Sequence, residues 1–182
     1  MSFSFQHTLE PLWQPASLIP SIHDIPHHSW LLDKCSLTQK LLEKSQGDFS
    51  VELVQQSIQH VLFSEAKALN IPNRQWALIR EVILYGQKKP WVYARTVIPL
   101  STLKGPLRRL HYLGNKPLGE QLFTDPTMQR EPVEVAQLPA QWLPKKLNIH
   151  TSTWGRRSVF RLSNKPLLVS EVFLPELLKK TR

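Results

Sequence analysis

The chain has 182 residues, of which 41% are hydrophobic and 20% are charged. This composition indicates one packed domain and excludes an intrinsically disordered protein. Lys and Arg number 23 against 14 acidic residues, a formal net charge of +9, which favours anionic partners. Because no nucleic-acid-binding motif accompanies the charge, a solvated basic surface is preferred over nucleic-acid binding.

The cysteine content and the N-terminal residues indicate a compartment. Cys35 is the single cysteine, which excludes an internal disulfide. Residues 1–7 lack the basic and apolar regions of a secretory signal, and no apolar run approaches the roughly 20 residues of a membrane span. We therefore expect a cytoplasmic protein without stable membrane insertion.

The chain begins with a Pro-rich segment, and the first predicted helices and strand follow it. Residues 1–28 contain four prolines and are expected to form an irregular arm on a domain of residues 29–182. Its histidines His23, His27 and His28 lack carboxylate or cysteine partners at ligand spacing, so no metal site is predicted. A short helix is expected to begin near Ser29, and the capping-box pattern of Ser36 and Gln39 predicts a second. Residues 49–56 alternate as a strand, and a polar connection is expected up to residue 73.

Hairpins dominate the rest of the chain. Residues 75–85 and 91–98 alternate as two strands around a turn, and residues 157–162 and 167–174 form a second such pair. Short helices are expected after Ser101 and near Pro117. A strand over residues 129–135 and a surface excursion over 136–153 complete the pattern. Strands joined by hairpins and separated from a few helices indicate a single antiparallel α+β domain.

Two charged residues break the apolar pattern of their strands. Arg80 shares a face with Trp76, Leu78, Val82 and Leu84, and Glu171 shares a face with Leu167, Val169 and Phe173. An unpaired charge there carries a desolvation penalty of several kcal/mol. Three interpretations are open. The two side chains have partners within the protein, or the opposite face of the strand is the one that faces the core, or the two side chains line a cavity. In a cavity the arginine would bind a carboxylate and the glutamate would accept a hydroxyl or handle a proton.

Other charged residues give weaker signals. Arg95, Arg156, Arg157 and Arg161 lie in or beside strands, where a solvated face is the preferred role for most of them. Sequence motifs of serine hydrolases, P-loop proteins, dinucleotide-binding proteins and zinc proteases are absent.

Seven ordered segments give a more specific indication. The segments resemble the chorismate pyruvate-lyase family, in the order in which that family carries them. They are residues 76–81, 90–99, 101–106, 113–119, 122–123, 154–158 and 165–175. The resemblance implies a sheet of about six antiparallel strands flanked by helices, with a buried ligand site under helical flaps. It does not cover residues 1–28, and the stretch before Trp154 is longer here than the family pattern requires.

The resemblance also implies an activity and a set of site residues. The family cleaves chorismate to 4-hydroxybenzoate and pyruvate, the first committed step toward ubiquinone, without a cofactor or a metal. Arg80 matches the arginine that binds the ring carboxylate, and Glu171 matches the active-site glutamate near the para oxygen. Leu118 matches a leucine whose backbone amide serves the site. Leu37 stands where a relative has a methionine that contacts the ligand, so a backbone contact would be preserved and a thioether contact would be lost.

Some assignments stay open at this point. A second cation, Arg95 or Arg157, is expected to receive the pyruvyl carboxylate, and a monomer is expected. The main alternative is a non-catalytic small-molecule sensor, because a similar fold serves as the effector-binding domain of some bacterial transcription regulators. Such regulators carry a separate helix-turn-helix domain, and 28 Pro-rich residues are too few to form one. A basic nucleic-acid-binding protein is the second alternative, and it would bind polyanions with a strong dependence on salt.

Overall fold

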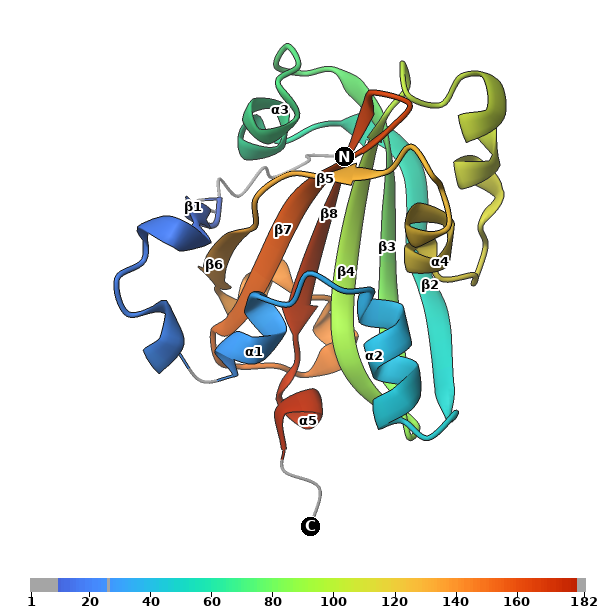
Figure 1. Ribbon diagram of the computed structural model, residues 1–182. Helices are drawn as coiled ribbons and strands as arrows, with labels where there is room; N and C mark the ends of the chain where they lie inside the picture. Colours follow the sequence, from blue (N-terminus) through green and yellow to red (C-terminus); the bar gives the residue numbers. More distant parts are fainter. Residues whose placement is uncertain (1–9, 26, 180–182) are drawn as a thin grey trace, which may run out of the picture.

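A single antiparallel sheet connects most of the chain in the computed structural model, which describes residues 10–25 and 27–179. Its 8 strands run in the order β1-β6-β7-β8-β4-β3-β2, with β5 paired to β7 (Figure 1). The strands are β1 (Gln14–Pro15), β2 (Phe49–His60), β3 (Trp76–Gly86), β4 (Lys89–Pro99), β5 (Gln129–Arg130), β6 (Glu134–Leu138), β7 (Thr153–Leu162) and β8 (Lys165–Phe173). The prediction of an antiparallel α+β domain is confirmed.

The strand count differs from the expected six because two strands are very short. β1 and β5 have two residues each. The segment predicted as one strand over residues 129–135 is divided into β5 and β6 by Pro132, which has no N–H to donate to a neighbouring strand. Part of the predicted N-terminal arm joins the sheet, since Gln14 pairs with Val135. Residues 1–9 and 26 of that arm lie outside the described residues.

Short helices lie on both faces of the sheet. The α-helices are α1 (His28–Leu31), α2 (Leu37–Lys44), α3 (Phe63–Leu69), α4 (Leu118–Phe123) and α5 (Pro175–Leu178). The 3-10 helices are η1 (Ala16–Leu18), η2 (Ile22–Asp24), η3 (Gly105–Tyr112), η4 (Ala140–Trp142) and η5 (Lys145–Leu147). In Figure 1, α1, α2 and α4 lie in front of the sheet, on the same face.

Local sequence explains where α2 begins and ends. The Ser36 hydroxyl accepts a hydrogen bond from the Gln39 N–H at 3.4 Å, as a helix N-cap does. The Gln39 side chain donates to Glu43 instead of returning to Ser36, so one half of the predicted capping box forms. Gly47 follows the helix with a φ of +90°, a conformation that favours glycine.

The strand register brings the two pattern-breaking residues onto one face. β3 pairs with β4, β4 with β8, and β8 with β7. Across these pairs Arg80 lies opposite Thr96, and Glu171 lies between Ala94 and Arg156. Because side chains on a strand alternate between faces, all five point to the face that carries α2 and α4.

Two segments differ from the sequence-based expectations. The polar connection expected up to residue 73 contains the last part of β2 and the helix α3, whose Ala66 and Leu69 are buried. The segment 136–153 is a covering layer and not a surface excursion. Its Leu143 and Leu147 pack with Ile83 on the face of the sheet opposite α2. Both segments are held by burial against the sheet, a tertiary effect that local polarity does not reveal.

β2 forms one edge of the sheet, and its outer side is partly covered. The Leu53 N–H donates to the Asn115 side chain at 3.3 Å, and the Gln56 side chain donates to the His111 carbonyl at 2.9 Å. The pairing of β2 with β3 shifts register between Leu53 and Gln55, the mark of a β-bulge. The segment that runs from η3 to α4 therefore lies along this edge (Figure 1).

Candidate active site

A cavity lies between the sheet and the helices α2 and α4. It contains about 530 Å³ of space free of atoms, including its opening to solvent. The residues around it are Leu37, Thr38, Val51, Arg80, Val82, Leu84, Ala94, Thr96, Pro117, Leu118, Gly119, Leu122, Phe123, Phe160, Val169 and Glu171. The four site residues that the sequence predicted, Arg80, Glu171, Leu37 and Leu118, are all among them.

Arg80 is a buried cation without a carboxylate partner in the described part of the chain. Its side chain is 1% exposed. One terminal nitrogen, Nη2, donates to the carbonyls of Gly114 at 3.0 Å and Lys116 at 2.9 Å. Its Nε is buried without a hydrogen-bond partner among the described residues. Burial lowers the pKa of the guanidinium to about 10, because removal from water disfavours the charged form. A buried guanidinium with unpaired N–H groups can bind the carboxylate of a ligand.

Glu171 lies on another side of the cavity and has an arginine partner. Its Oε2 accepts a hydrogen bond of 2.6 Å from Arg156 Nε. Arg156 is 1% exposed and is fixed in turn by the carbonyls of Trp30, at 2.9 Å, and Asp33, at 2.6 Å. The partner that the pattern demanded for Glu171 is therefore within the protein. The other carboxylate oxygen of Glu171, Oε1, accepts no hydrogen bond from the described residues and can accept one from a ligand.

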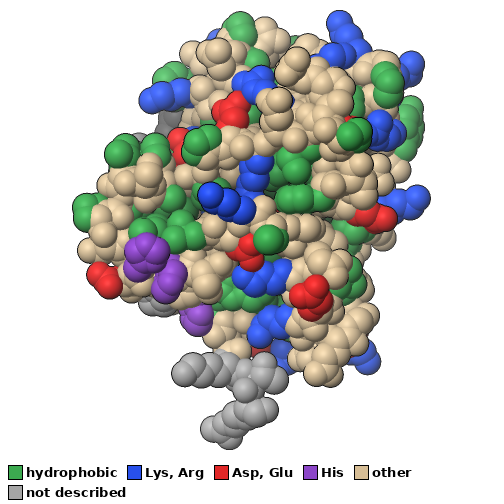
Figure 2. Space-filling model, in the orientation of Figure 1, with side chains coloured by type: hydrophobic (Ala, Val, Ile, Leu, Met, Phe, Trp, Pro, Cys, Tyr) green, Lys and Arg blue, Asp and Glu red, His purple; other side chains and the backbone are tan. Residues whose placement is uncertain are grey.

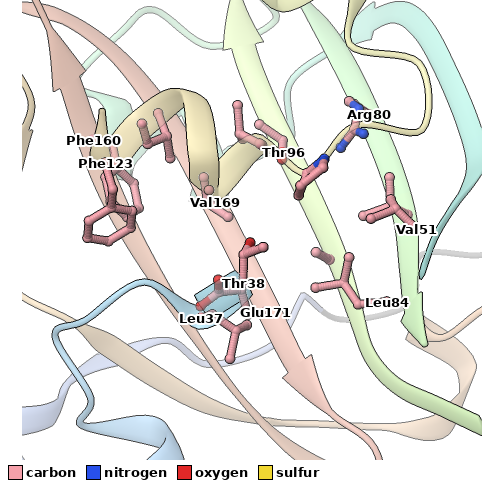
Figure 3. A pocket seen from close by; sticks show the side chains of 16 residues that line it. Leu37, Thr38, Val51, Arg80, Leu84, Thr96, Phe123, Phe160, Val169 and Glu171 are labelled. Atoms are coloured by element: carbon pink, nitrogen blue, oxygen red, sulfur yellow. The ribbon is translucent and has the colours of Figure 1, made fainter. Parts of the chain in front are cut away.

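The remaining walls are mostly apolar and suit a flat ring. Figure 3 shows Arg80 and Glu171 apart from each other, with Phe123 and Phe160 together on a further side. The two phenyl rings are 6.2 Å apart and nearly perpendicular, the edge-to-face arrangement that aromatic pairs favour. A cation at one position, a carboxylate at another and apolar walls between them match a small aromatic or cyclohexadienyl acid.

Leu37 and Leu118 lie at the first positions of α2 and α4, the two helices that cover the cavity. Backbone N–H groups in the first turn of a helix have no partner within that helix. Both residues can therefore present a backbone amide as well as an apolar side chain. The two helices meet at Gly119, where an added Cβ would lie 2.6 Å from the Thr38 hydroxyl oxygen.

The two residues expected to supply a second cation lie on the opposite face, so this expectation was wrong. Arg95 donates to Glu65 and Glu81, each at 2.7 Å, and Arg157 donates to Glu134 at 2.6 Å. Strand alternation explains this, since each is one residue away from a position that faces the cavity. Arg156 and Arg157 are also buried, in contrast to the solvated strand face that was preferred for them.

Two residues near the site were missed by sequence reasoning. Arg156 holds Glu171, and Thr96 lies opposite Arg80 on β4. Arg156 carried a signal in principle. If the second hairpin turns at residues 163–164, counting back along both strands places Arg156 opposite Glu171.

Comparison with known proteins decides the family. The family model described as chorismate lyase matches residues 9–182. The chain belongs to the chorismate lyase family. One relative, "Probable chorismate pyruvate-lyase 2" of Pseudomonas fluorescens, is 38% identical over 97% of this chain and 96% of its own length. Another, "Probable chorismate pyruvate-lyase" of Psychromonas ingrahamii, is 43% identical and covers 90% of each chain.

Solved structures share the fold of this chorismate lyase family member at low identity. PhnF from Mycobacterium smegmatis matches with a TM-score of 0.58 and 15% identity, over 82% of this chain and 68% of that one. The effector domain of the same protein matches with a TM-score of 0.54 and 14% identity, over 73% of this chain and 85% of that one. These likenesses concern the fold alone. Within the described residues, no helix is both long and apolar enough to span a membrane.

Proposed function

We propose that this protein is a chorismate pyruvate-lyase, which cleaves chorismate to 4-hydroxybenzoate and pyruvate at the first committed step toward ubiquinone. The observation that carries the proposal is the placement of Arg80, a buried guanidinium without a carboxylate partner among the described residues, in one apolar cavity with Glu171. Membership of the chorismate lyase family supports the same substrate.

The cleavage of chorismate needs few catalytic groups from the enzyme. Chorismate is a dianion with a ring carboxylate, a ring hydroxyl para to it, and an enolpyruvyl ether on the carbon beside the hydroxyl-bearing carbon. The hydroxyl-bearing carbon loses its proton, the ether C–O bond breaks, and the electron pair completes the aromatic ring. The enolpyruvate that leaves takes up a proton and becomes pyruvate. Since aromatisation supplies the driving force, the enzyme needs to hold the dianion, exclude water and favour the elimination geometry.

The site residues divide these tasks. Arg80 binds the ring carboxylate through its free N–H groups, including the unpaired Nε. Glu171, with Oε2 on Arg156, offers Oε1 to the ring hydroxyl and assists proton transfer. The amides of Leu118 and Leu37 contact the ligand from the two covering helices. A backbone contact at Leu37 tolerates leucine in place of the methionine of a relative.

The proposed function extends to the oligomeric state, the compartment and the partners of the enzyme. It acts as a monomer in the cytoplasm, takes chorismate as its small-molecule partner, and needs no nucleic acid, metal or organic cofactor. An enclosed site shaped for an aromatic acid also holds its product, so opening of the covering helices as flaps and product release limit turnover.

The direct test is to mix the purified protein with chorismate and to follow 4-hydroxybenzoate and pyruvate together. We expect both products in equal amounts, with kcat lowered at least a hundredfold in Glu171→Gln. Glu131→Gln is a matched control, because Glu131 pairs with Arg161 away from the cavity. Absence of products from folded protein that still binds 4-hydroxybenzoate would identify a sensor and contradict the proposed activity.

A further inference from the structure

The second carboxylate of the substrate needs a cation that the cavity wall does not provide. Chorismate carries two carboxylates, and Arg80 is the single Lys or Arg among the residues around the cavity. A carboxylate moved out of water without a partner is costly. With the enolpyruvyl group beside the ring hydroxyl, its carboxylate lies toward Glu171 when the ring carboxylate is on Arg80. The second cation is therefore to be sought beyond Glu171.

Arg130 lies in that direction. It pairs with Phe160 across β5 and β7, and its guanidinium carbon is 5.2 Å from the centre of the Phe160 ring, which forms part of the cavity wall. Its Nη1 donates to the Asp33 carbonyl at 3.3 Å, and Arg156 Nη1 donates to the same oxygen at 2.6 Å. Arg130 is therefore linked to Glu171 through one shared carbonyl and Arg156. Figure 3 places both Phe160 and Glu171 away from Arg80.

Arg130 also has binding capacity left. Its hydrogen bonds go to uncharged groups, Ser158 Oγ at 3.1 Å and the Asp33 carbonyl, and it forms no ion pair within the described residues. Burial, and then the neighbouring charge of Arg156, lower its pKa, so an incoming carboxylate would relieve both effects. Nη2 donates to no group in the described part of the chain.

The other cations near this end are already engaged. Arg156 is bonded to Glu171 at 2.6 Å, and Lys40 is bonded to the Asp33 carboxylate at 2.6 Å. Arg95 and Arg157 lie on the other face of the sheet, each with its own carboxylate. Within residues 10–25 and 27–179, Arg130 is the remaining arginine at the Glu171 end that forms hydrogen bonds to uncharged groups alone.

We propose that Arg130 binds the enolpyruvyl carboxylate of chorismate, and that it thereby distinguishes the dianionic substrate from the monoanionic product. This inference rests on the proposed function. It assigns the two carboxylates to two arginines, with the ring carboxylate on Arg80 and the side-chain carboxylate on Arg130. The product 4-hydroxybenzoate has no group that reaches Arg130, so its binding is independent of that residue.

The test compares substrate and product in Arg130→Met, Arg130→Lys and a control, Arg161→Met. Arg161 lies one residue after Phe160, on the other face of β7, and pairs with Glu131. We expect Arg130→Met to lower kcat/KM for chorismate by about ten- to a hundredfold, the size of a charge-assisted hydrogen bond. The Kd of 4-hydroxybenzoate should change less than threefold. Arg130→Lys should recover part of the loss, and Arg161→Met should resemble the wild type.

The outcomes separate the two proposals. An unchanged kcat/KM in Arg130→Met would overturn the inference. Equal losses of kcat/KM and of product affinity would also overturn it, because Arg130 would then only support the loop at Asp33. A wild-type protein that binds 4-hydroxybenzoate but releases no products would instead contradict the proposed function, and the inference with it.

Discussion

At the scale of single residues, Arg80 illustrates how a binding group lowers stability. Among the residues that the structure describes, its buried charge has no carboxylate partner and its Nε has no acceptor. Even a buried ion pair can often be replaced by apolar side chains of similar volume with a neutral or stabilising effect, and a buried charge without a counter-ion has less attraction to lose. We expect Arg80→Met to keep or raise the free energy of unfolding while the affinity for 4-hydroxybenzoate falls at least a hundredfold. Urea unfolding without ligand and a fluorescence titration measure the two effects.

A matched arginine on the other face should behave in the opposite way. Arg95→Met leaves Glu65 and Glu81 without their cation, and loss of one partner of a buried ion pair costs about 3–5 kcal/mol. The Kd of 4-hydroxybenzoate for Arg95→Met should stay within threefold of the wild-type value. If Arg80→Met were destabilised as much as Arg95→Met, Arg80 would have a structural role and the argument for a ligand site would fail.

Asp33 supplies a prediction about pH. Burial raises the pKa of its carboxyl group, but the hydrogen bonds from Lys40 and from the Cys35 N–H outweigh burial, and the pKa lies below its usual 3.8. A carboxyl group with a lowered pKa in the folded state stabilises above its unfolded pKa and loses this effect as the pH falls through its folded pKa. Asp33→Asn should therefore lower the free energy of unfolding at pH 6, by at most about 1 kcal/mol for a partly exposed pair. The difference should shrink below about pH 4, with the exposed Asp24→Asn as a control in urea unfolding.

At the scale of elements, α2 and α4 both lie against the cavity and contact each other, and we expect this contact to control access to it. A Cβ on Gly119 would lie 2.6 Å from Thr38 Oγ1, so Gly119→Ala forces the two helices apart or rotates Thr38. We expect 4-hydroxybenzoate to dissociate about tenfold faster from this variant in a stopped-flow experiment. Adding Thr38→Ala should restore much of the slow release, because it removes the atom that clashes. Equal release rates in all three proteins would contradict a role for these helices as flaps.

The sequence predicted those elements whose pattern is local. The hairpins containing Arg80 and Glu171 were visible from strict alternation, and both residues stood out because they are charged on apolar faces. α3 was not visible, because its helix is held by the burial of Ala66 and Leu69 against the sheet. The choice between Arg156 and Arg157 was indicated only indirectly, through the position of the hairpin turn at residues 163–164. The two are adjacent, and only the register with β8 decides which one points toward Glu171.

At the scale of the whole molecule, the net charge of +9 acts on a dianionic substrate before any contact forms. Figure 2 shows Lys and Arg side chains distributed over the face that carries α1, α2 and α4. Salt shortens the range of such attraction from about 30 Å at 0.01 M to about 3 Å at 1 M. We expect kcat/KM for chorismate to fall several-fold over this range. If product release limits turnover, as proposed above, kcat should stay nearly constant. A kcat/KM that does not depend on potassium chloride would show that the charge serves another purpose.

The partly covered outer edge of β2 has a consequence for how copies of the protein meet. An uncovered edge strand of 12 residues would offer its free N–H and C=O groups to a strand of another molecule. Here the amide of Leu53 is already taken by Asn115, and the bulge beside it interrupts the straight run that a second strand would need. A strand added from a second molecule would therefore have to displace the Asn115 side chain and bridge the bulge, which makes fibril growth by strand addition unfavourable in this part of β2.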